Sequence, residues 1–116
     1  MVWAMLLSRW ARPGQIAGAL ALSGRLFPDL LAPGTPLHAR LADPQQLAGM
    51  PILATHGAQD FITPVDIGRE NERALSGWAP QADLVYLEDP DCGHEISPVV
   101  AAAVSRWFEE HVTATE

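Results

Sequence analysis

Residues 50–60, MPILATHGAQD, contain the run that decides the fold. The first eight residues are mostly apolar and end at a glycine, which is typical of a fully buried β-strand. Residues 16–24, IAGALALSG, have a similar length and character. Strands that are apolar on both faces favour a parallel sheet, because helices cover both sides of such a sheet.

A helix is predicted shortly after the run at 50–57. Thr63 has the character of an N-cap, and Pro64 suits the first helical position. The residues that follow on one helical face are Ile67, Asn71, Leu75 and Trp78. We therefore expect this face of the helix to pack against the sheet.

A third strand and a final helix follow. Residues 82–89, ADLVYLED, alternate well enough for a strand. The final helix is predicted to begin with Ser97 as its N-cap and Pro98 at its first position. One face of this helix carries Val100, Val104, Trp107, Phe108 and His111.

Two further segments complete the order of elements. Residues 2–11 carry apolar side chains at helical spacing, and RPG at 12–14 ends that predicted helix. Residues 27–49 are rich in proline and glycine, which indicates an irregular surface excursion with a helical turn at 44–48. The sequence therefore predicts one α/β domain over 1–116, with a three-stranded parallel sheet flanked by helices and right-handed crossovers.

The composition excludes several classes of protein. The chain has 116 residues, of which 48% are hydrophobic, and this suits one modest globular unit. Its net charge of −7 argues against binding to phosphate backbones, so we expect no nucleic-acid partner. The single cysteine, Cys92, excludes an internal disulfide framework. The four histidines and this cysteine match no zinc spacing, so we expect no metal.

The N-terminal residues do not have the pattern of an export signal. No basic residue precedes the apolar run, and Arg9 and Arg12 interrupt it. No apolar run approaches the ~18 residues that a membrane span needs. We therefore expect a cytoplasmic protein without a membrane span.

The residues that could take part in catalysis follow the ends of two predicted strands. In a parallel α/β sheet, functional residues lie at the carboxyl ends of the strands. THGAQD at 55–60 follows one strand and DCGHE at 91–95 follows the next, so we expect Asp60 and His94 to lie within hydrogen-bond reach. An imidazole can take a proton from a hydroxyl, while a carboxylate on its other nitrogen fixes the tautomer.

Each of these residues also has a purely structural interpretation. Asp60 can bond to the backbone of its own turn, and His94 to a neighbouring carbonyl. For His56, a backbone hydrogen bond at the end of a buried strand is the favoured interpretation, and we leave it out of the site. Cys92 lies two residues from His94, a spacing that seldom gives proton-transfer geometry, so a buried or incidental thiol is expected.

The motifs taken together resemble a known family. HGAQDFITP at 56–64, GHEISP at 93–98 and ALSG at 21–24 are similar to segments in the later part of an α/β-hydrolase. More narrowly, they resemble the phospholipase/carboxylesterase family, which includes acyl-protein thioesterases. The resemblance implies that Asp60 and His94 are the acid and base of a catalytic triad, with no cofactor.

The nucleophile of that triad is the part that the sequence does not supply. No G-x-S-x-G elbow occurs, and the serines are predicted in helices, near a helix end, at a cap, or at the end of a strand: Ser8, Ser105, Ser76, Ser97 and Ser23. The resemblance implies that the chain starts just after the elbow. The serine, the oxyanion-hole loop and the N-terminal half of the fold are then expected to be absent.

Two functions from different classes remain open. The chain is either the C-terminal portion of a serine esterase or thioesterase acting on a small ester or thioester, or a non-catalytic fragment that serves as a folded or interaction domain. Phe61 and Ile62 could line an acyl pocket if one forms. The strand at 16–23 would present an open edge, so we expect a complementing N-terminal half or a homodimer to cover it.

Overall fold

A computed structural model of the chain shows a parallel sheet between two helices. The structure describes residues 18–24 and 43–111. Strands β1 (Ala19–Leu22), β2 (Pro51–Gly57) and β3 (Asp83–Asp89) lie in the order β1-β2-β3, and both pairs are parallel. The predicted fold class is confirmed for these residues.

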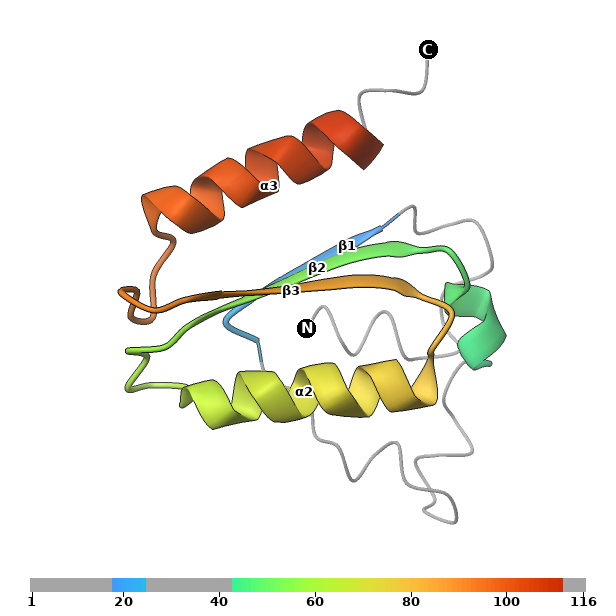
Figure 1. The fold of residues 1–116 in the computed structure, drawn as a ribbon, viewed down its shortest axis with the longest axis horizontal. Helices are drawn as coiled ribbons and strands as arrows, with labels where there is room; N and C mark the ends of the chain where they lie inside the picture. The colour runs from blue at the N-terminus through green and yellow to red at the C-terminus, as the bar shows by residue number, and fades with distance from the viewer. Residues whose placement is uncertain (1–17, 25–42, 112–116) are drawn as a thin grey trace.

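Helices cover both faces of the sheet (Figure 1). Helix α2 (Val65–Trp78) connects β2 to β3 on one face, and helix α3 (Pro98–His111) follows β3 on the other. A short 3-10 helix, η3 (Pro44–Leu47), precedes β2, where the sequence predicts a helical turn. The predicted helix at 2–11 and most of the predicted excursion at 27–49 lie outside the described residues. No helix in the described ranges is long and apolar enough to cross a bilayer.

The core lies mainly between the sheet and α2. Ile52 and Leu75 are completely buried there, and Ala54 packs in the same cluster. Side chains of a strand alternate between its two faces, so Ile52, Ala54 and His56 all point toward α2. Leu53 points to the other face, toward α3. The face of α2 predicted from the sequence is confirmed, since Asn71 and Leu75 are buried.

The predicted start of α2 is wrong by one residue. Pro64, not Thr63, is the N-cap, and no side chain caps the helix. The cause is the turn that precedes the helix, because the Thr63 amide donates to Asp60 and the Thr63 carbonyl accepts from His56. Both backbone groups of Thr63 are therefore committed to that turn.

One member of the predicted face of α3 is also misplaced. Phe108 is 42% exposed, whereas Val100 is buried. Trp107 is the residue that faces the sheet, since a β-carbon on Gly18 would lie 2.8 Å from its ring. Consecutive helical residues are about 100° apart, so Phe108 projects to the side, with its ring edge-on to that of Trp107.

Candidate active site

Asp60 lies in a tight turn directly after β2. Its backbone amide donates to the Gly57 carbonyl, 3.2 Å away, and its Oδ1 accepts from the amides of Ile62 and Thr63, each at 2.8 Å. The side chain is completely buried. The structural interpretation of Asp60 is therefore correct for one carboxylate oxygen, and Oδ2 remains available to a partner.

His94 provides that partner. Its Nδ1 lies 2.8 Å from Oδ2 of Asp60, so the expected contact between the two residues is confirmed. A carboxylate oxygen can only accept, so Nδ1 carries the hydrogen. The ring is 39% exposed, in contrast to the buried carboxylate. Its Nε2 is then the nitrogen that can accept a proton from another molecule or residue.

The surroundings of Asp60 favour its ionised form. Burial would raise its pKa, but hydrogen bonds from the Thr63 amide, the His94 ring and the Ile62 amide outweigh burial, and the pKa lies below the ordinary value of 3.8. Asp60 is therefore an anion at neutral pH. An anion in this position can stabilise a positive charge that forms on His94.

Backbone contacts hold the two loops of the site together. The Ala58 amide donates to the Asp89 carbonyl and the Gln59 amide to the Cys92 carbonyl, both at 2.9 Å. Gly57 permits this approach, since a β-carbon there would lie 2.3 Å from the Cys92 carbonyl oxygen. The loop that carries His94 is thus fastened to the loop that carries Asp60.

The loop of His94 is also closed at its base. Ser97 Oγ donates to Oδ2 of Asp89 at 2.5 Å and accepts from the Val100 amide at 3.2 Å. The Asp91 amide donates to Oδ1 of Asp89. These hydrogen bonds from Ser97 and Asp91 lower the pKa of Asp89, against a smaller opposing effect of burial. The predicted N-cap at Ser97 is confirmed, whereas its second bond, to Asp89, was not predicted from the sequence.

Cys92 contributes to the site through its backbone carbonyl and a buried side chain. Its side chain is 1% exposed, and its Sγ lies 3.3 Å from the carbonyl oxygens of Gly93 and Glu95. The expected buried thiol is confirmed. Among the described residues, no group of three histidine, cysteine, aspartate or glutamate side chains could hold a metal ion.

The serines of the described ranges do not complete a triad. Ser76 lies in α2 and Ser105 in α3, while Ser23 ends β1 with φ at 54° and donates its amide to the Thr55 carbonyl. None of the serines in residues 18–24 and 43–111 forms a hydrogen bond with His94.

The fold of the chain is similar to that of several solved structures. The acyl-protein thioesterase 2 of Zea mays matches with a TM-score of 0.69 at 21% identity, over 85% of this chain and 42% of its own. The esterase PE8 matches with a TM-score of 0.70 at 20% identity, over 96% of this chain and 46% of its own. SOBER1 of Arabidopsis thaliana matches with a TM-score of 0.72 at 18% identity, over 96% and 47%.

The chain has part of an α/β-hydrolase fold. It spans less than half the length of these solved structures. No family model and no curated protein matches the sequence. The likeness therefore shows part of the α/β-hydrolase fold and does not by itself show an activity.

Exposed apolar side chains lie close in sequence to Asp60 and His94. Phe61 is 92% exposed and Ile62 is 75% exposed, directly after Asp60. Ile96, two residues after His94, is 62% exposed. These three side chains are therefore available for contact with another molecule.

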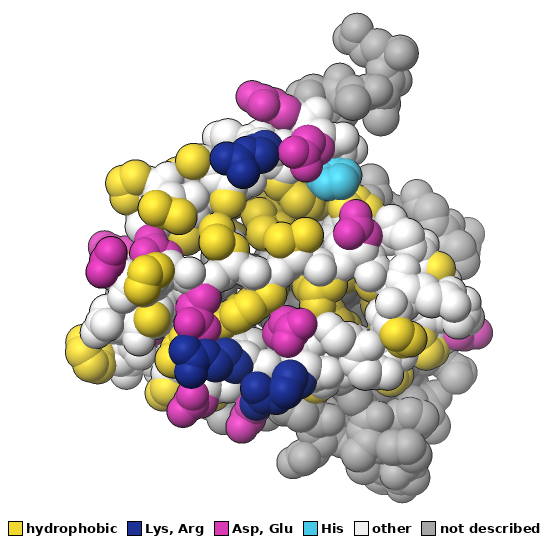
Figure 2. Space-filling view, in the orientation of Figure 1, with side chains coloured by type: hydrophobic (Ala, Val, Ile, Leu, Met, Phe, Trp, Pro, Cys, Tyr) yellow, Lys and Arg dark blue, Asp and Glu magenta, His cyan; other side chains and the backbone are white. Residues whose placement is uncertain are grey.

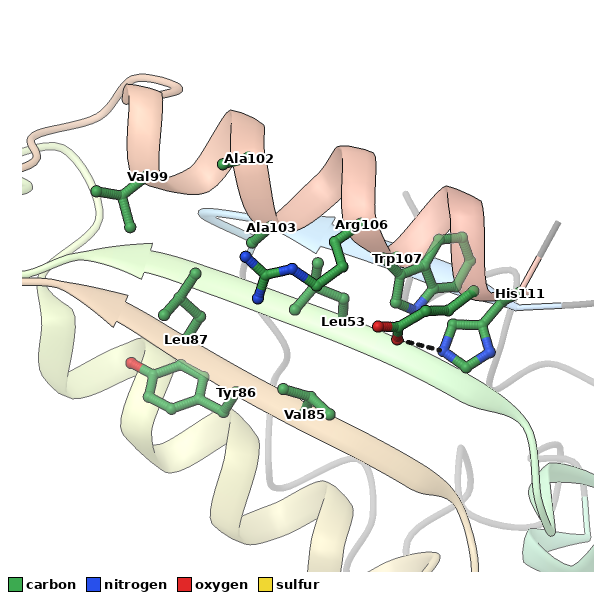
Figure 3. A pocket seen from close by; sticks show the side chains of 11 residues that line it. Leu53, Val85, Tyr86, Leu87, Val99, Ala102, Ala103, Arg106, Trp107 and His111 are labelled. Atoms are coloured by element: carbon green, nitrogen blue, oxygen red, sulfur yellow. Dashed lines mark ion pairs between the residues drawn. The ribbon is translucent and has the colours of Figure 1, made fainter. Parts of the chain in front are cut away.

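A separate hollow lies between α3 and the sheet. Figure 2 shows hydrophobic side chains gathered there, and Figure 3 shows them closer: Leu53, Val85 and Leu87 of the strands face Val99, Ala103 and Trp107 of α3. The hollow has a volume of about 520 Å³. Arg106, Glu110 and His111 lie at its rim, and Glu110 lies 3.8 Å from His111. Neither Asp60 nor His94 lines it, so we do not assign it to the candidate active site.

Proposed function

We propose that this chain supplies the acid and the base of a serine hydrolase that cleaves carboxylic esters or thioesters. The observation that carries the proposal is the 2.8 Å contact between a buried, ionised Asp60 and the Nδ1 of a partly exposed His94, at the carboxyl ends of adjacent strands. In this arrangement His94 Nε2 takes the proton of an attacking hydroxyl, and Asp60 stabilises the imidazolium.

The nucleophile in this proposal comes from residues outside the chain. The sequence has no G-x-S-x-G elbow, and the similar solved structures extend over more than twice the matched length. A second half of the fold would bring the serine to Nε2 and supply the oxyanion-hole amides. Without those amides, a tetrahedral intermediate loses roughly 3 kcal/mol per missing donor. We therefore expect the chain alone to show only background hydrolysis.

The substrate and partner follow from the same proposal. Phe61 and Ile62 would contact the apolar part of an ester or thioester, or the second half of the fold. Within the described ranges β1 has a strand partner on one side only, and that free edge would receive the second half or, failing that, another copy of this chain. A cytoplasmic location is part of the proposal.

The test is a complementation assay. The chain is mixed with a separately produced N-terminal half of an acyl-protein thioesterase that carries the elbow, and hydrolysis of a short p-nitrophenyl ester is measured. We expect turnover only in the mixture, and none with His94→Ala. His111→Ala is the matched control, because His111 lies at the far end of α3 and should leave turnover unchanged.

Two results would contradict the proposal. One is a stable complex of the two halves, seen by size-exclusion chromatography, that has no activity above background. The other is full activity with His94→Ala. The first result would favour the alternative that the chain is a non-catalytic interaction domain.

A further inference from the structure

We propose that His56 is a positioning residue for the Asp60–His94 pair, an inference that rests on the proposed function. His56 lies in β2, its side chain is 2% exposed, and its Nε2 lies 2.6 Å from the Thr63 carbonyl oxygen. A buried ring with a backbone bond is what the sequence predicts for this residue. The inference is that the bond secures the turn on which Asp60 depends.

Hydrogen bonds connect His56 to Asp60 through the backbone of Thr63. His56 holds the carbonyl of Thr63, and the amide of the same Thr63 donates to Oδ1 of Asp60 at 2.8 Å. The neighbouring amide of Ile62 donates to the same oxygen. Because these two bonds fix the rotation of the carboxylate, they also aim Oδ2 at His94. Loss of the His56 bond therefore frees the peptide that orients the acid.

His56 does not donate a hydrogen bond to Oδ2 of Asp60. A carbonyl oxygen only accepts, so the hydrogen of His56 lies on Nε2 and is directed at Thr63. Oδ2 of Asp60 lies 3.6 Å from the same nitrogen, which is too far for a hydrogen bond. Among residues 18–24 and 43–111, His94 is thus the one hydrogen-bond donor to Oδ2 of Asp60.

Helix α2 packs directly against the His56 ring. Gly68 faces the ring, and a β-carbon at this position would lie 2.7 Å from Nδ1 and 2.8 Å from Cγ of His56. A glycine inside a helix lowers the stability of the helix relative to alanine. Its presence opposite His56 fits a ring that is packed directly against the helix backbone.

The test reads the tautomer of His94 in the isolated chain. Two-bond ¹H–¹⁵N spectra of the imidazole rings distinguish a hydrogen on Nδ1 from one on Nε2. In the unmodified chain, neutral His94 should carry its hydrogen on Nδ1, since Asp60 accepts it. His56→Leu removes the donor to Thr63, so we expect loss of the Nδ1–H form of His94. His56→Gln keeps an N–H at the end of the side chain and should restore it.

If His56→Leu does not fold, the comparison of His56→Asn with His56→Gln decides the matter. His56→Asn is polar but too short to reach the Thr63 carbonyl, so it should lose the Nδ1–H form that His56→Gln retains. The inference is overturned if folded His56→Leu or His56→Asn keeps the Nδ1–H form, or if folded His56→Gln loses it. The spectra require no substrate and no second half, so an inactive complementation mixture refutes the proposed function without deciding this test.

Discussion

Replacing Gly57 by alanine should separate the two loops that bring Asp60 and His94 together. Gly57 is the last residue of β2, and it is buried against the backbone of the His94 loop. An added β-carbon would lie 2.3 Å from the carbonyl oxygen of Cys92, 2.4 Å from that of Gly93 and 2.7 Å from the carbonyl carbon of Cys92. All three atoms belong to the backbone, so no side-chain rotation can relieve the contact.

The size of the effect follows from these distances. Ordinary contact begins at 3.4 Å, so the two segments must move apart by about 1 Å, and overpacking of this kind costs about 1–3 kcal/mol. The movement also strains the hydrogen bond from the Gln59 amide to the Cys92 carbonyl, which contributes about 1 kcal/mol. Together we expect a loss of about 2–4 kcal/mol in the free energy of unfolding.

Urea denaturation followed by circular dichroism measures this loss. With a slope of about 2 kcal/mol per molar urea, the midpoint should fall by about 1–2 M. Gly93→Ala is the matched control in the same site, because its β-carbon would meet only the Gln59 carbonyl oxygen at 3.7 Å, an ordinary contact. An unchanged midpoint for Gly57→Ala, or an equal fall for Gly93→Ala, would refute the reasoning.

Three further predictions address the site and the core. Ser97→Ala should lower the free energy of unfolding by about 1–3 kcal/mol in thermal melts, since it removes an N-cap and the hydrogen bond to Oδ2 of Asp89, whereas Ser97→Thr should recover part of the loss. The lowered pKa of Asp60 contributes stability that is present above the ordinary value of 3.8 and is lost as the pH falls through the folded-state pKa; the stability gap between the unmodified chain and Asp60→Asn should therefore narrow in urea titrations below about pH 4, and a constant gap would contradict this. Ile52→Ala should lower the free energy of unfolding by about 2–5 kcal/mol, because Ile52 is completely buried. Val85→Ala, at a residue 54% exposed, should lower it by less than about 1 kcal/mol, and equal losses would contradict the position of the core between the sheet and α2.

Much of the fold was predictable because it depends on local patterns. The apolar run at 50–57 forms β2, and the alternating run at 82–89 forms β3, within a residue at each end. The connection of two parallel strands through a helix is nearly always right-handed, which limits where the helix can pack on the sheet. The strand-end rule then places Asp60 and His94 side by side, and the structure confirms this contact.

The remaining features of the site depend on contacts between residues distant in sequence. The N-cap of α2 lies one residue later than predicted because Thr63 bonds to His56 and Asp60. An N-cap pattern in the sequence holds no information about such partners. Asp89 read as the polar end of a strand, yet it holds Ser97 eight residues later. Phe108 shares a helical face with Val100 by periodicity alone, but the packing of Trp107 over Gly18 sets the rotation of α3.

The described part of the chain contains several contacts that orient the candidate acid and base. Amides of its own turn hold Asp60, the carbonyls of Asp89 and Cys92 fasten one loop to the other, and Ser97 closes the loop of His94. In the proposed function, a second half of the fold would therefore meet a pair already at 2.8 Å and would not have to arrange it. Because groups held in position before binding cost less entropy to use, the second half would need to supply only the nucleophile and the oxyanion-hole amides.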